Sequence, residues 1–137
     1  PATKRKPVRG HVGVMLIQVL IVDDNADNRA LLRRVLEPTG WLVAEADSGD
    51  AALREVKKGL TDLVLLDIGM PGMSGIEVLK RIRQGRSPEE LPVVMVTGSD
   101  RIDDAIEACS NGANDYLRKP LKIKDVVARL KRHLGKT

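Results

Sequence analysis

Apolar and polar residues alternate along this chain in blocks of two kinds. Short apolar runs, of the length of a β-strand, lie near residues 17–22, 41–46, 62–66, 92–97 and 115–118. Longer blocks in which apolar residues recur every three or four positions, as in helices, lie near residues 26–37, 49–58, 75–84, 101–111 and 123–134. The pattern therefore predicts five repeats of a strand followed by a helix.

Local signals agree with this reading. Ser74 and Glu77 form a capping box at the start of the third predicted helix, and Pro38 is expected to close the first helix. The runs 19–22 and 63–66 are apolar at every position, as in central parallel strands that helices cover on both faces. With right-handed crossovers, the sequence predicts an α/β fold, a doubly wound parallel sheet in three layers.

We expect one domain over residues 17–134, between a basic N-terminal tail (1–16) and a short C-terminal tail (135–137). Residues 1–14 hold four of the 23 basic residues and no acid, which leaves 19 bases against 19 acids. The pI of 9.4 therefore belongs to the tail and does not favour nucleic-acid binding. The tail is either a leader or vector sequence or a linker from an upstream domain.

The apolar stripe of the fourth predicted helix consists of Ile102, Ala105, Ile106 and Cys109, and its helical spacing predicts that it faces the core. One cysteine excludes an internal disulfide and suits a reducing compartment. No apolar stretch approaches the ~20 residues of a membrane span, so we expect a cytoplasmic location and no membrane partner.

Polar residues follow the strands in a pattern that predicts a site. Asp23 and Asp24 follow the first strand, Asp67 the third, Thr97 the fourth and Lys119 the fifth. Ligands of an open parallel sheet bind beyond the carboxyl ends of its strands. Clustered carboxylates favour a hard divalent cation, and a hydroxyl and an ammonium offset charge on a phosphoryl group. Taken singly, each of these residues is more typical of a turn or a solvated side chain; together they indicate a site.

Four segments carry a family resemblance. Residues 19–25 resemble the opening of response-regulator receiver domains, and residues 65–75 are similar to their phosphoacceptor segment. Residues 96–98 and 112–120 are similar to two later motifs. The resemblance covers roughly residues 17–134, and it implies the flavodoxin-like strand order 2-1-3-4-5.

The resemblance implies a role for each acid. Asp67 would attack a phosphohistidine of a sensor kinase or a histidine phosphotransfer protein and become an aspartyl phosphate. Asp23, Asp24 and Asp67 would hold Mg²⁺, for which Mn²⁺ could substitute, either directly or through water. The backbone carbonyl of Gly69 would be a further ligand.

The resemblance also implies how the phosphoryl group is held and sensed. Lys119 would neutralise phosphoryl oxygens, Thr97 would hydrogen-bond one of them, and the Lys119–Pro120 bond would be cis. Thr97 and Tyr116 would act as the switch, although Tyr116 also fits a plain aromatic residue on an edge strand. The surface of the fourth helix, fifth strand and fifth helix would bind a downstream protein or a second copy of the chain.

Two alternatives accompany this interpretation. The same receiver could be excised from a hybrid kinase or from a regulator with an output domain. A Mg²⁺-dependent aspartyl phosphatase of the haloacid-dehalogenase type needs a second acid two residues after its nucleophile. Asn25 and Gly69 stand at those positions, so we expect a signalling phosphoacceptor and not an enzyme.

Overall fold

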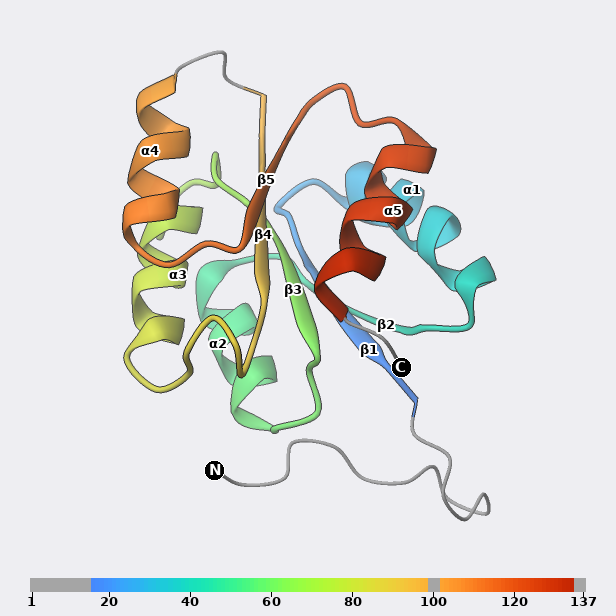
Figure 1. The fold of residues 1–137 in the computed structure, drawn as a ribbon, viewed down its shortest axis with the longest axis horizontal. Coiled ribbons are helices and arrows are strands. Elements are labelled where there is room, and N and C mark those ends of the chain that lie inside the picture. The colour runs from blue at the N-terminus through green and yellow to red at the C-terminus, as the bar shows by residue number, and fades with distance from the viewer. Residues whose placement is uncertain (1–15, 99–101, 135–137) are drawn as a thin grey trace.

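Five parallel strands form one sheet in the order β2-β1-β3-β4-β5 in a computed structural model, which describes residues 16–98 and 102–134 (Figure 1). The strands are β1 (Gln18–Val22), β2 (Leu42–Ala46), β3 (Leu63–Asp67), β4 (Val93–Thr97) and β5 (Asp115–Arg118). Every neighbouring pair is parallel. The predicted strand order is confirmed, and with it the doubly wound, flavodoxin-like fold.

Helices cover both faces of the sheet, as the fully apolar central strands require. The α-helices of the described ranges are α1 (Ala26–Leu36), α2 (Gly49–Lys57), α3 (Gly75–Arg83), α4 (Ile102–Ser110) and α5 (Ile123–Leu134). Helices α1 and α5 lie on one face, and α2, α3 and α4 lie on the other (Figure 1). Alternate residues of β1 therefore enter two separate cores: Val19 packs on the α1/α5 side, and Leu20 packs on the α2/α3 side.

The ends of the helices follow their predicted signals. The Ser74 hydroxyl accepts a hydrogen bond from the Glu77 N–H at 3.3 Å and caps α3. Helix α1 ends at Leu36, one residue earlier than predicted, and passes into a short 3-10 helix, Glu37–Thr39. Pro38 has no N–H to continue the α-helical bonding, so the chain tightens there before it turns at Gly40.

Helix α4 differs from its prediction. Ile102 and Ile106 are 71% and 59% exposed, and Cys109 is also exposed. The helix instead buries Ala108 and half-buries Ala105. The prediction that Cys109 lies in the core is therefore wrong, because α4 turns its small side chains toward the protein and leaves the larger apolar ones in solvent.

A half-buried arginine, Arg83, connects the loops at the amino edge of the sheet. The Arg83 guanidinium donates to the carbonyl oxygens of Gly112 and Leu91 and to the side-chain oxygen of Asn114, each at 2.9 Å. Burial lowers the pKa of Arg83. The hydrogen bonds connect the end of α3 with the turns that precede β4 and β5.

The first described strand begins and the last described helix ends at the same edge of the sheet, opposite the carboxyl ends of the strands (Figure 1). The predicted N-terminal tail, apart from residue 16, and the C-terminal tail lie outside the described residues. Within residues 16–98 and 102–134, no helix combines the length and apolar character that a membrane crossing requires.

Candidate phosphoacceptor site

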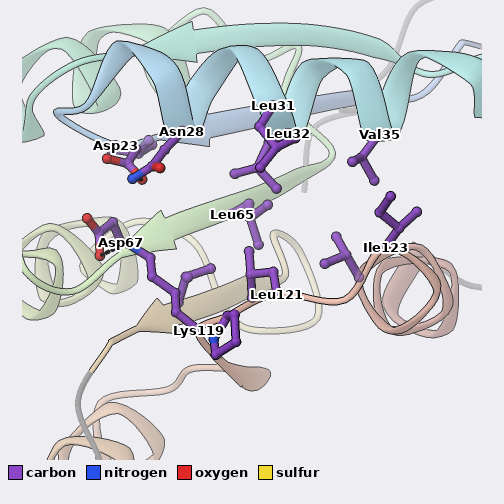
Figure 2. Close-up of a pocket in the computed structure, with 14 residues that line it drawn as sticks. Asp23, Asn28, Leu31, Leu32, Val35, Leu65, Asp67, Lys119, Leu121 and Ile123 are labelled. Atoms are coloured by element: carbon purple, nitrogen blue, oxygen red, sulfur yellow. Dashed lines mark hydrogen bonds and ion pairs between the residues drawn. The ribbon is translucent and has the colours of Figure 1, made fainter.

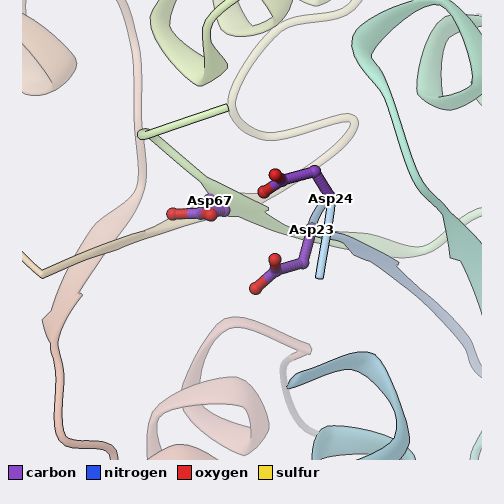
Figure 3. Close-up of side chains that lie close together, drawn as sticks. All are labelled: Asp23, Asp24 and Asp67. Carbon is purple, nitrogen blue, oxygen red and sulfur yellow. The ribbon is translucent and has the colours of Figure 1, made fainter. Parts of the chain in front are cut away.

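The three predicted acids meet at the carboxyl edge of the sheet (Figure 3). Asp67 ends β3, and Asp23 and Asp24 follow the adjacent strand β1, so parallel pairing brings their carboxylates together. One oxygen from each lies within 4.8 Å of the others. Asp23 and Asp67 are buried, at 3% and 6% exposure, whereas Asp24 is exposed.

This donor set fits magnesium. Oxygen ligands at about 2.0–2.1 Å from Mg²⁺ lie roughly 3–4 Å from one another, and the ion usually keeps several waters. Three carboxylate oxygens within 4.8 Å can therefore share one ion, directly or through its waters. The exposed side of the cluster, at Asp24, leaves room for those waters.

Several hydrogen bonds fix Asp23. Its Oδ1 accepts from the Asn25 backbone N–H at 2.9 Å, and its Oδ2 accepts from the Asn28 side-chain Nδ2 at 3.2 Å (Figure 2). Its backbone carbonyl accepts from Arg29 Nη1 at 2.8 Å. The same Arg29 bonds Glu45 of β2 through Nε at 2.9 Å. The loop that presents Asp23 is thus tied to the neighbouring strand.

Asp67 experiences opposing influences. Burial raises the pKa of Asp67; the Lys119 ammonium, 3.8 Å from Oδ1, lowers it, and the charge of Asp23 raises it again. The Gly69 N–H also favours the charged form, because it donates to Oδ1 at 3.2 Å. A cation among the acids would favour the carboxylate form, which is the nucleophilic one.

Thr97 and Lys119 approach the same edge. Thr97 ends β4 at 3% exposure, and its carbonyl accepts from the Lys119 N–H at 2.8 Å. The Lys119–Pro120 bond is cis, as predicted. Tyr116 lies farther back on β5, half-buried, and lines a hollow of about 360 Å³ beside α5. The exposed backbone at Gly69 follows Asp67 directly.

A second feature, an apolar groove, was not predicted from the sequence. It has a volume of about 360 Å³ and runs from Asp23 and Asp67 between α1 and α5 (Figure 2). Its apolar lining includes Leu31, Leu32, Val35, Leu121 and Ile123. Leu31 and Ile123 are 56% and 62% exposed. The helical pattern of α1 could have suggested the feature, because Leu31 and Leu32 are adjacent and cannot both face the sheet.

Comparison with known proteins agrees with this geometry. Residues 19–131 match the response regulator receiver domain. The chain belongs to that family. The fold and the family resemblance expected from the sequence are both confirmed, and this receiver domain is accordingly a module of two-component phosphorelay signalling.

Relatives with curated descriptions include larger regulators. The receiver domain is 36% identical over 117 residues to the phosphate regulon transcriptional regulatory protein PhoB of Escherichia coli, covering 85% of this chain and 51% of PhoB. It is 37% identical over 114 residues to the transcriptional regulatory protein ResD of Bacillus subtilis, covering 83% of this chain and 46% of ResD. The chain thus spans about half the length of these relatives.

The similarity extends to solved structures that this chain covers almost completely. A putative response regulator from Chloroflexus aurantiacus superposes with a TM-score of 0.82 and 36% identity, covering 88% of this chain and 99% of that one. A CheY-like receiver domain protein from Methanospirillum hungatei superposes with a TM-score of 0.81 and 29% identity, covering 87% and 94%.

Proposed function

We propose that this receiver domain is a phosphoacceptor in which Asp67 takes a phosphoryl group from a histidine of a sensor kinase or a phosphotransfer protein, in a Mg²⁺-dependent reaction in the cytoplasm. One observation carries the proposal. A buried carboxylate, Asp67, lies within 4.8 Å of two further acids and 3.8 Å from the Lys119 ammonium. This arrangement supplies a nucleophile, a cation site and a positive group at one point.

The transfer is an in-line displacement at phosphorus. A carboxylate oxygen of Asp67 forms the new P–O bond while the P–N bond of the phosphohistidine breaks, and the imidazole leaves with the electron pair. The Lys119 ammonium and the Thr97 hydroxyl offset the charge on the phosphoryl oxygens. When bound by Asp23, Asp24, Asp67 and the Gly69 carbonyl, Mg²⁺, or Mn²⁺ in its place, supplies further charge neutralisation.

Phosphorylation adds about −1.5 to −2 charges at the site. We propose that Thr97 and Tyr116 respond and alter the surface formed by α4, β5 and α5, where a downstream protein or a second copy binds. The exposed side chains Ile102 and Ile106 support this surface, because large apolar groups in solvent are typical of an interface.

The groove between α1 and α5 is our proposed contact for the phosphodonor. It starts at Asp67 and is flanked by the exposed side chains Leu31 and Ile123. An amphipathic helix from the donor could place apolar residues there while its phosphohistidine reaches Asp67. Because relatives such as PhoB are about twice as long, we keep the alternative that this receiver works within a larger regulator or hybrid kinase.

Chemical phosphorylation tests the proposal. We expect acetyl phosphate or phosphoramidate with Mg²⁺ to add one hydroxylamine-sensitive phosphoryl group, measured by intact mass, and EDTA to abolish the labelling. Asp67→Asn should remain unlabelled. Asp62→Asn is the matched control. Asp62 is also buried, but it precedes the first residue of β3, whereas Asp67 is the last. Equal labelling of Asp67→Asn and the wild type would refute the assignment.

A further inference from the structure

Asp23 is held in place by groups of the protein itself. Its two carboxylate oxygens have different partners: the Asn25 N–H bonds Oδ1 at 2.9 Å, and the Asn28 carboxamide bonds Oδ2 at 3.2 Å. The torsion that turns an aspartate carboxylate about its own axis is soft and has broad minima. One hydrogen bond leaves this rotation free, whereas a second bond to the other oxygen fixes the plane of the carboxylate.

Helix capping does not account for the side chain of Asn28. The N-cap of α1 is Asn25, whose side chain accepts from the Asn28 backbone N–H at 2.9 Å. The Asn28 carboxamide is therefore left to interact elsewhere, and it is turned toward Asp23 at the mouth of the groove between α1 and α5 (Figure 2). An amide donates a hydrogen bond there without adding charge to a site that already holds three acids.

The backbone of Asp23 is fixed separately. Arg29 Nη1 donates to its carbonyl at 2.8 Å, and Arg29 Nε bonds Glu45 of β2 at 2.9 Å. Glu45 also bonds Arg33 at 2.7 Å, so Arg29 and Arg33, one turn apart on α1, share this carboxylate. Arg29 thus fixes the backbone position of Asp23, and the Asn28 carboxamide fixes the orientation of the Asp23 carboxylate.

We infer that Asn28 is a positioning residue of the cation site, which orients the Asp23 carboxylate for Mg²⁺ before the ion arrives. The inference rests on the proposed Mg²⁺-dependent function. Hydrogen-bond partners of metal ligands typically contribute 10- to 100-fold to metal affinity. Because the Asn28 bond is long at 3.2 Å, we expect the lower end of this range, about tenfold.

The test compares Asn28→Leu, which keeps the size of the side chain and removes its donor, with the wild-type full chain. Isothermal titration with Mg²⁺ should give a dissociation constant about tenfold higher for the variant. The free energy of unfolding of Asn28→Leu, measured with urea in EDTA, should differ little from that of the wild type. Asn28→Gln, which retains an amide, should recover part of the Mg²⁺ affinity. Asn111→Leu is the matched control. Asn111 lies just after α4, and its side-chain amide donates to the Glu107 carbonyl, away from the acid cluster.

Each outcome decides between the two proposals. If Asn28→Leu binds Mg²⁺ as tightly as the wild type, Asn28 does not position the ligand and the inference is wrong. If the Mg²⁺ affinity of Asn28→Leu falls only in proportion to its free energy of unfolding in EDTA, Asn28 has a structural role and the inference is also wrong. Failure of the wild type itself to bind Mg²⁺ would instead reject the proposed function, and the inference with it.

Discussion

Replacing Asp67, the proposed phosphoacceptor, by its amide should stabilise the metal-free protein. Asp67→Asn removes one of three clustered charges and keeps the shape of the side chain, and its amide oxygen can still accept from the Gly69 N–H. We therefore expect the variant to have a higher free energy of unfolding than the wild type in EDTA at neutral pH. A loss of function would accompany a gain in stability.

The magnitude follows from the distances. With an effective dielectric constant of about 20, two like charges at the 4.8 Å limit repel by about 3.5 kcal/mol. Asp23 and Asp24 each repel Asp67 in this way, whereas Lys119 at 3.8 Å attracts it by about 4.4 kcal/mol. Because Asp24 is exposed and Lys119 is about one-third exposed, solvent screens both, and we expect a net gain of about 1–2 kcal/mol.

Urea unfolding with and without metal measures the effect. In EDTA the midpoint of Asp67→Asn should lie above that of the wild type. At a Mg²⁺ concentration of about 100 times the dissociation constant, the wild type should gain about 2.7 kcal/mol and the variant, which lacks one ligand, much less. The order of stability should therefore reverse. A variant less stable than the wild type in EDTA would show that the repulsion among these acids is not a significant cost.

Further predictions concern groups outside the acid cluster or beside it. Burial raises the pKa of Asp115, but its hydrogen bond with His133 and the charge of Arg129 hold that pKa below its ordinary value. These contacts therefore stabilise the fold at neutral pH, and their contribution is lost as the pH falls through the lowered pKa. At pH 7, Asp115→Asn should lower the free energy of unfolding in urea by about 1 kcal/mol. The difference from the wild type should disappear at a pH where the wild-type carboxylate is protonated. Arg83→Met should lower the free energy of unfolding in urea by about 2–4 kcal/mol, because it leaves the part-buried carbonyl oxygens of Gly112 and Leu91 without this donor. Lys119→Ala should bind Mg²⁺ at least as well as the wild type but label with acetyl phosphate at least about tenfold more slowly.

The residues of the acid cluster could be predicted because their placement depends on strand order alone. Asp23 follows β1 and Asp67 ends the neighbouring parallel strand β3, so a register that buries Val19 and Leu63 brings both acids to one edge. The same reasoning placed Thr97 at the end of β4. Position along the sheet follows from the pattern of apolar runs, without knowledge of any side-chain contact.

Features that depend on helix rotation escaped prediction. In α4 the periodic stripe through Ile106 and Cys109 indicated a buried face, but Ala108 is the residue that packs inward. Apolar periodicity identifies an apolar stripe along a helix. Whether this stripe packs on the sheet depends on which side chains are small enough to let the helix approach the sheet closely. The groove beside Leu31 required two helices almost a hundred residues apart, and the hydrogen bond from Asn28 required a specific rotamer.

The location of the first strand and the last helix has a practical consequence. Since β1 begins and α5 ends at the edge away from the carboxylates, a tag or surface anchor joined to either end need not obstruct Asp67 (Figure 1). The domain can therefore be immobilised by either end for binding measurements with candidate phosphodonors. By the same geometry, a reporter protein joined directly to residue 16 or residue 134 would begin at the edge of the sheet opposite Asp67. Any change in its signal would have been transmitted through the packed body of the domain.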